Sequence, residues 1–156
     1  MIAVTVTVNG TRHDVEVEPQ VTLLELLRER LFLRGAKEGC GVGECGACLV
    51  LLDGEPVSSC LVLAADADGR AVETVEGLAR DGALDPVQAA FVDHGAIQCG
   101  YCTPAMVLAA EALLRRRPDP GPAETAEALA GVLCRCGSYP KVLAAVAAAA
   151  ATKAVR

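Results

Sequence analysis

The chain has 156 residues, of which 53% are hydrophobic and eight are cysteine, and its formal net charge is −6. The acidic excess lies in residues 1–80, which carry thirteen Asp and Glu against seven Lys and Arg, and it argues against nucleic acid as a partner, because such binding needs a basic patch. Only four residues are aromatic, so each half can bury a small core at most, and bound metal would contribute to folding.

The first residues predict a β-hairpin. Residues 2–8 and 12–18 alternate between apolar and polar side chains, which is the period of a half-buried strand. Between them stands Asn9-Gly10, the dipeptide favoured in two-residue hairpin turns. No basic segment followed by an apolar run opens the chain, so we expect no secretory signal and a cytoplasmic location.

The rest of the first half predicts one helix and two more strands. The segment Thr22-Leu-Leu-Glu25 has the capping-box pattern and predicts a helix to about Leu33. A glycine-rich loop at 35–46 precedes short strands at 47–52 and towards Cys60. We therefore expect an α+β fold whose first domain is residues 1–76.

The second half, residues 77–156, predicts four helices. Three of the predicted starts have a capping residue followed within two positions by proline, which is favoured at the beginning of a helix. The fourth start follows a break in the chain. The starts are Asp85-Pro86, Thr103-Pro104, Ala123 and Ser138-Tyr139-Pro140. The longest apolar run is ten residues, too short for a membrane span.

The eight cysteines fall into two sets of four. The first set has the spacing C-x4-C-x2-C-x11-C and the second C-x2-C-x31-C-x-C. Their members are Cys40, Cys45, Cys48 and Cys60, then Cys99, Cys102, Cys134 and Cys136. Four thiolates are the ligands of one [2Fe–2S] cluster, and C-x4-C-x2-C is the plant-type spacing. The pattern predicts two metal centres and an electron carrier.

Other uses of clustered cysteines fit less well. Disulfides are rare in a reducing cytoplasm, and structural zinc sites usually pair two short C-x2–4-C knuckles, unlike the first set. Glycines between the first three cysteines allow amide groups to point at the sulfurs. The second set leaves zinc open from spacing alone, although its cysteines precede two predicted helices whose positive ends would face an anionic cluster.

Three segments carry a family resemblance: GAKEGCGVGECGACLVLLDGEPVSSC, QCGYCTPAMVL and LCRCGSYPKV. They closely resemble the iron–sulfur subunit of the molybdenum hydroxylases, the family of xanthine dehydrogenase, aldehyde oxidase and carbon monoxide dehydrogenase. The resemblance implies an N-terminal plant-type ferredoxin-like β-grasp domain and a C-terminal four-helix-bundle domain, each holding one [2Fe–2S] cluster.

The resemblance also implies partners and roles. A large subunit would hold a molybdopterin-type cofactor and a medium subunit FAD. Electrons would pass from molybdenum to the second cluster, then to the first, then to FAD or another acceptor. Gln98 would lie beside the pterin, and Cys136 would both ligate iron and approach the pterin. No catalytic residue is expected in this chain.

The last motif departs from the family pattern, N-L-C-R-C-T-G-Y. Val132, Gly137 and Ser138 replace its Asn, Thr and Gly. We expect Ser138 still to cap the final helix. Two other functions remain open on the residues alone: a free-standing ferredoxin-like carrier, for which the first half would suffice, and a zinc-stabilised interaction module.

Overall fold

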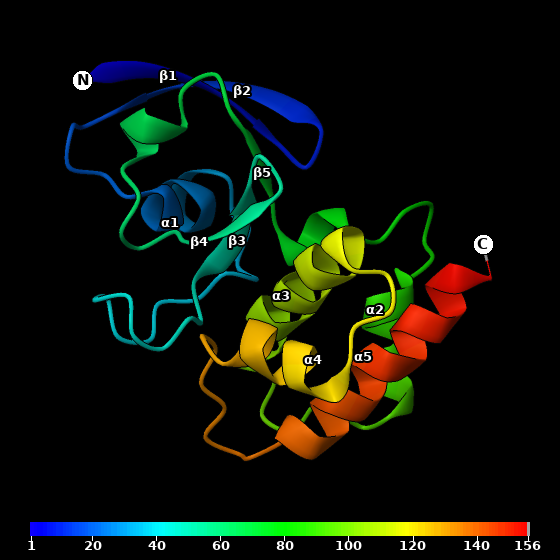
Figure 1. Cartoon of the computed structure of the whole chain (residues 1–156). Helices are drawn as coiled ribbons and strands as arrows, with labels where there is room; N and C mark the ends of the chain where they lie inside the picture. Colours follow the sequence, from blue (N-terminus) through cyan, green and yellow to red (C-terminus); the bar gives the residue numbers. More distant parts are fainter. Residues whose placement is uncertain (156) are drawn as a thin grey trace.

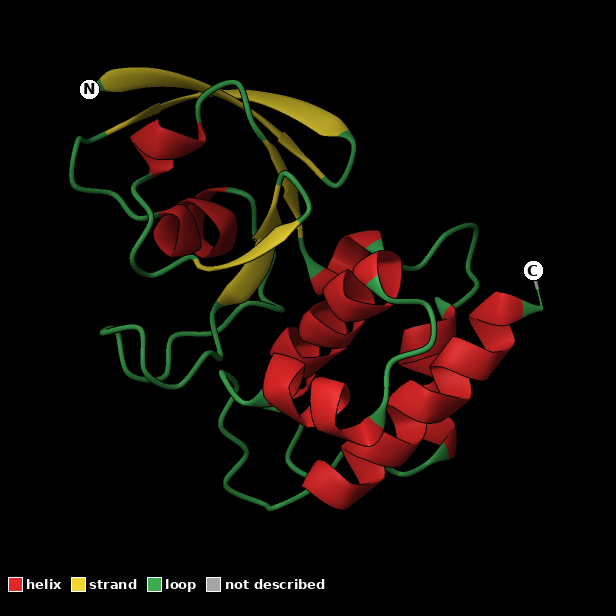
Figure 2. Ribbon diagram, in the orientation of Figure 1, coloured by secondary structure: helices red, strands yellow, loops and turns green. Residues whose placement is uncertain are grey.

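The computed structural model describes residues 1–155, with a β-sheet in the first half of the chain and helices in the second (Figure 1, Figure 2). The strands are β1 Ile2–Val8, β2 Thr11–Val17, β3 Leu49–Leu52, β4 Glu55–Ser58 and β5 Ala71–Glu73. The helices are α1 Leu23–Glu25, α2 Pro86–Asp93, α3 Thr103–Arg116, α4 Pro122–Leu129 and α5 Tyr139–Ala154. The predicted α+β composition is confirmed.

The five strands form one sheet in the order β2-β1-β5-β3-β4. The predicted hairpin is confirmed: β1 and β2 are antiparallel, and Asn9 and Gly10 between them have φ of 51° and 81°. The central strand β5 was not predicted, because three residues are too few to show a period. β1 and β3 supply its hydrogen bonds, pairing with it in parallel and antiparallel orientation respectively.

The first helix is shorter than predicted. Thr22 and Glu25 form the expected capping box, but the turns after α1 widen into a π-helix, Leu26–Arg30, which ends three residues before Leu33. Phe32, with φ of 56°, then turns the chain into the cysteine loop. The prediction failed here because nothing in the apolar pattern separates a helical leucine from one in the exit turn.

Two hydrophobic cores meet at β3. Val50 and Leu52 lie in the core between the sheet and α1, whereas Leu51 lies in the core of the helices. Successive side chains of a strand point to opposite faces, so this one strand contributes to both cores. The sheet is thus covered by α1 on one face and packs through β3 on α3.

The helix starts explain which caps were predicted correctly. The carboxylate of Asp85 accepts a hydrogen bond from the amide of Val87, and the predicted cap of α2 is confirmed. Thr103 is the first residue inside α3, after Cys102, and does not cap it. Ser138 stands at the cap position of α5, but its hydroxyl bonds no amide of the first turn, so that prediction was wrong.

Along residues 1–155 no helix has the length and apolarity to cross a membrane.

Candidate metal centres

The loop of the first cysteine set directs backbone amides at one exposed sulfur. Cys40 Sγ accepts hydrogen bonds from the amides of Val42, Glu44 and Cys45 at 3.5, 3.3 and 3.4 Å. These bonds, led by that of Val42, lower the pKa of the Cys40 thiol to about 7. The loop therefore favours a thiolate at this position, and thiolates are the form that binds metal.

The other pair of thiols in this set is held by the sheet. Cys48 immediately precedes β3 and is buried, Cys60 follows β4, and their sulfurs lie 3.4 Å apart. The hydroxyl of Ser59 donates to the carbonyl of Cys48 at 2.6 Å and ties the two segments together. Burial, followed by the neighbouring Cys48, raises the pKa of Cys60 to about 11. A cation would be needed to hold both sulfurs ionised.

Two glycines of the loop are required by close approach. A Cβ on Gly39 would lie 2.6 Å from Cys45 Sγ, so a side chain there would occupy the space of the thiols. Gly46 has φ of +69°, and a Cβ on it would lie 2.1 Å from the carbonyl oxygen of Gly131. The second contact brings the first cysteine loop against the segment that leads to the second set.

The second set surrounds the N-terminal ends of two helices. Cys102 immediately precedes α3, and Cys134 and Cys136 precede α5. Burial, followed by the neighbouring Cys134, raises the pKa of the Cys102 thiol to about 12. Burial alone would raise the pKa of the Cys134 thiol. The backbone amide of Ser138 and the Cys102 thiol outweigh that effect, so the pKa is lowered overall.

The structure brings Gln98 and Cys136 together. The amide nitrogen of Gln98 donates to the carbonyl oxygen of Cys136 at 3.4 Å, and both residues are exposed. Cys99, the neighbour of Gln98, is exposed as well. These residues form one end of the second set and are open to a partner.

The arrangement of thiols fits an iron–sulfur cluster. Among residues 1–155 no three or more His, Cys, Asp and Glu side chains gather as the ligands of a single metal ion would. The sulfurs of Cys48 and Cys60 lie 3.4 Å apart, and Cys40 Sγ accepts from the backbone amide of Cys45. The thiols of Cys102 and Cys134 each shift the pKa of the other. A [2Fe–2S] cluster takes two ligands on each of its irons, and pairs of neighbouring thiols suit that arrangement.

The two cysteine segments contact each other directly, which the sequence did not reveal. The amide of Leu133, next to Cys134, donates to the carbonyl oxygen of Cys45 at 2.9 Å. The hydroxyl of Tyr101 donates to the carbonyl of Glu38 in the first loop. Tyr101 lies inside the C-x2-C motif, but no pattern in a single sequence indicates its bond to a residue 63 positions earlier.

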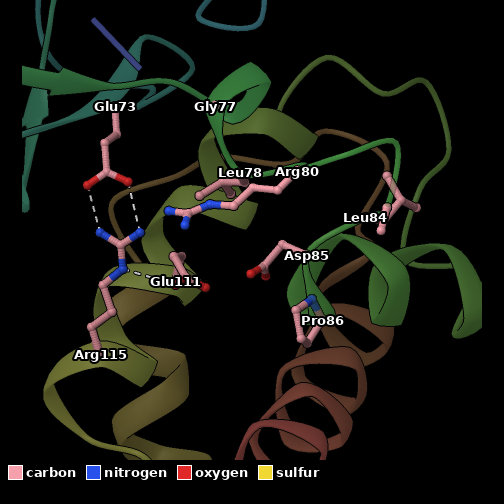
Figure 3. Close-up of a pocket in the computed structure, with 10 residues that line it drawn as sticks. Glu73, Gly77, Leu78, Arg80, Leu84, Asp85, Pro86, Glu111 and Arg115 are labelled. Atoms are coloured by element: carbon pink, nitrogen blue, oxygen red, sulfur yellow. Dashed lines mark hydrogen bonds and ion pairs between the residues drawn. The ribbon is translucent and has the colours of Figure 1, made fainter. Parts of the chain in front are cut away.

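A charged cavity of about 300 Å³ lies elsewhere, at the junction of sheet and helices (Figure 3), and no cysteine lines it. Arg115 of α3 binds both carboxylate oxygens of Glu73, at 2.7 and 2.8 Å, and Glu111 at 3.0 Å. Lys153 of α5 contacts Glu111 and lies 3.6 Å from Asp85. These charges pair with one another, so the network joins β5 to the helices.

The ion pair of Glu73 and Arg115 stays charged at neutral pH. The hydrogen bond from Arg115 lowers the pKa of Glu73 from its ordinary 4.5. The stabilisation from a depressed carboxyl pKa is present above the ordinary value and is lost as pH falls through the folded value. This contact therefore weakens only in acid.

Two family models match this chain, and each describes a domain that binds a [2Fe–2S] cluster. Residues 6–79 match the 2Fe-2S iron-sulfur cluster binding domain, and residues 74–147 match the [2Fe-2S] binding domain. The nicotinate dehydrogenase small FeS subunit of Eubacterium barkeri is 48% identical over 145 residues, covering 93% of this chain and 92% of that protein. The xanthine dehydrogenase iron-sulfur-binding subunit of Escherichia coli is 45% identical over 145 residues, covering 91% and 90%. The chain belongs to the iron–sulfur subunits of the molybdenum hydroxylase family.

Solved structures of this family share the fold. Quinoline 2-oxidoreductase from Pseudomonas putida is similar with a TM-score of 0.94 and 41% identity, over 99% of this chain and 96% of that chain. The aldehyde oxidoreductase from Desulfovibrio desulfuricans is similar with a TM-score of 0.95 and 37% identity. That match covers 99% of this chain but only 17% of the other, longer chain. The chain carries two [2Fe–2S] clusters as the iron–sulfur subunit of a molybdenum-containing oxidoreductase, and the zinc interpretation is set aside.

Proposed function

We propose that each cysteine set holds one of the two clusters. Cys40, Cys45, Cys48 and Cys60 would hold one in a plant-type ferredoxin-like β-grasp domain, residues 1–76. Cys99, Cys102, Cys134 and Cys136 would hold the other in a four-helix-bundle domain, residues 77–156. When bound, such a cluster accepts and releases one electron at a time. The separate core of each half supports this division.

We further propose that electrons enter at the helical half and leave from the sheet half. A large subunit would hold the molybdopterin-type cofactor against Gln98 and Cys136, and a medium subunit would hold FAD. The exposure of Gln98, Cys99 and Cys136 supports an entry point there. The whole complex would carry out oxidative hydroxylation of a small substrate in the cytoplasm.

The observation that carries the proposed transfer between the two sites is the contact between the cysteine segments. The bond from the amide of Leu133 to the carbonyl of Cys45 connects a neighbour of Cys134 to a residue of the other set without any side chain between them. A carrier whose sites worked separately would not require such a junction. It supports a relay through one chain rather than two independent sites.

The proposal is tested in the assembled complex with Cys45→Ser and Cys136→Ala. After mixing with substrate and rapid freezing, electron paramagnetic resonance should show the Cys45→Ser complex still reducing the helical-half cluster while transfer to the acceptor stops. Cys136→Ala should block reduction of both clusters and weaken co-purification with the large subunit, because ligation is coupled to folding. If Cys45→Ser instead blocks the first reduction, the proposed order is reversed.

The free-standing carrier is the alternative that this test separates. The sheet half has its own hydrophobic core. This core favours the free-standing carrier, because such a carrier would not need the helices. Purification of the chain from its native host should yield large and medium subunits with it. A chain that is recovered alone, and that exchanges electrons with a small oxidoreductase, would favour the free carrier.

A further inference from the structure

The side chain of Tyr101 attaches the second cysteine motif to the first cysteine loop. Tyr101 lies between Cys99 and Cys102, and its hydroxyl donates to the backbone carbonyl of Glu38, two residues before Cys40. The two bonded residues are 63 positions apart, so the bond is a tertiary contact and not part of the turn of either motif. It joins the two cysteine sets through a group that a substitution can remove.

The aromatic ring of Tyr101 makes a second contact with the same segment. The ammonium nitrogen of Lys37 lies 5.8 Å from the ring centroid, within the range of a cation–π interaction. That ammonium donates to the carbonyl of Gly35 at 3.0 Å, and the amide of Lys37 donates to the carbonyl of Ala47 at 3.0 Å. Lys37 and Glu38 are neighbours, so the ring and the hydroxyl of Tyr101 both hold the start of the cysteine loop.

The far end of the loop is held by backbone contacts. The carbonyl of Cys45 accepts from the amide of Leu133 at 2.9 Å, and a Cβ on Gly46 would lie 2.1 Å from the carbonyl oxygen of Gly131. A loop that is attached at one end can rotate about that attachment, whereas attachments at both ends fix its orientation. The start of the loop therefore depends on Tyr101 for an orientation that the far end alone does not impose.

We propose that Tyr101 is a positioning residue for electron transfer between the two clusters, because its bond to Glu38 fixes how the sheet-half site faces the helical-half site. This role rests on the proposed function, in which each cysteine set holds one cluster. Cys40 and Cys45 lie between the two attachments, so a shift of the loop would move both of them relative to Cys102. Electron transfer between two centres slows steeply as their separation grows, so the orientation of the loop sets the rate of the relay.

The test compares the wild type with Tyr101→Phe in the full chain with both clusters. Phenylalanine keeps the ring beside Lys37 but cannot donate to Glu38. Hydrogen exchange followed by mass spectrometry should show the amides of residues 37–48 exchanging about 2- to 10-fold faster, the shift in local opening that the loss of one net hydrogen bond produces. Electron paramagnetic resonance should show a changed magnetic interaction between the two reduced clusters, with the iron content of the wild type.

The rate of the relay is measured in the assembled complex. After mixing with substrate and rapid freezing, the helical-half cluster of Tyr101→Phe should be reduced as fast as in the wild type, and the sheet-half cluster should follow more slowly. A residue with a purely structural role would change stability without separating these two rates.

Thr152→Val is the matched control. The exposed hydroxyl of Thr152 also donates to a backbone carbonyl, that of Ala148 at 3.0 Å, but at the end of α5 that is far in sequence from the cysteines. This variant should leave the exchange of residues 37–48, the magnetic interaction and both reduction rates unaltered.

The outcomes separate the role of Tyr101 from the proposed function. A Tyr101→Phe chain with faster loop exchange but an unchanged magnetic interaction and relay rate would overturn the positioning role, and so would a chain with none of the three changes. Equal changes in Thr152→Val would also overturn it, because they would show a general effect of losing a hydroxyl. If the wild-type complex itself passes no electron from the helical-half to the sheet-half cluster, the proposed relay fails and the role of Tyr101 fails with it.

Discussion

The cysteine loop of the sheet half surrounds its exposed thiol with irregular backbone, whereas the cysteines of the helical half lie in the segments that lead into two long helices. In the first site three amides within six residues converge on Cys40. In the second, Cys102 and Cys134 are brought together from segments 32 positions apart by the packing of α3 and α5. The comparison teaches that the first site is specified mainly by local sequence and the second by tertiary structure.

The largest expected effect is the loss of one cluster while the other cluster is retained. In the proposed ligand assignment, Cys48→Ser removes a buried thiolate before β3, and Cys102→Ser removes a half-buried one before α3. Each variant should lose about two of roughly four irons and one of two resonance signals, since four cysteines hold each cluster. Iron analysis and resonance spectra check this.

The thermal unfolding of these two variants sharpens the comparison. Ligation energy adds to folding energy, and the second site has fewer local constraints than the first. We therefore expect the larger loss of melting temperature in Cys102→Ser. Loss of all irons from either variant would show that the halves do not fold as separate units.

The next effect concerns the junction between the sites. Gly46→Ala forces a left-handed residue to carry a Cβ, which costs about 1–2 kcal/mol, and places it against the carbonyl of Gly131. The total loss of unfolding free energy should be roughly 3 kcal/mol or more. The magnetic interaction between the two reduced clusters should also change, because the segments must separate.

Gly54→Ala is the matched control for that variant. Gly54 has φ of +85° in the turn after β3, but a Cβ there meets nothing within 4 Å. It should cost about 1–2 kcal/mol from the backbone alone and leave the magnetic interaction unaltered. Equal losses in both glycine variants would mean that the contact with Gly131 is unimportant.

The sequence predicted the first site more completely than the second for the same physical reason. The hairpin and the glycine-rich loop are local patterns, and each is present. Strand β5 and the contact of Leu133 with Cys45 depend on residues distant in the chain, so no local pattern could predict them. Ser138 shows the limit clearly: its type predicted a cap, but its hydroxyl is buried and bonds no amide of the first turn of α5.

A smaller effect is expected where the charged network joins the halves. Arg115→Met would leave Glu111, whose side chain is 5% exposed, with Lys153 as its remaining cation. Breaking a buried pair is costly, but Arg115 and Glu73 are partly exposed and solvent screens them, so we expect a loss of about 1–2 kcal/mol. Chemical denaturation measures it.

The neighbouring exposed pair provides the control for Arg115. Arg116 contacts Glu55 at 3.3 Å, and both side chains are more than half exposed. Arg116→Met should change the unfolding free energy by about 0–1 kcal/mol. A loss as large as that of Arg115→Met would show that the cavity network contributes no more than a surface ion pair.

The smallest effect on the protein itself is expected at Gln98, where the comparison of the two sites becomes functional. Its side chain is exposed and makes one long hydrogen bond, 3.4 Å, to the carbonyl of Cys136. Gln98→Ala keeps every thiol, so iron content and both resonance signals should remain, with a change in stability of about 0.5 kcal/mol or less.

In the assembled complex, however, substrate should reduce the helical-half cluster of Gln98→Ala more slowly, while a small chemical reductant reduces it at the normal rate. Gln20→Ala, a change on the exposed turn before α1, should leave both rates unaltered. Equal slowing with both reductants would place the role of Gln98 in the cluster site rather than in contact with the large subunit.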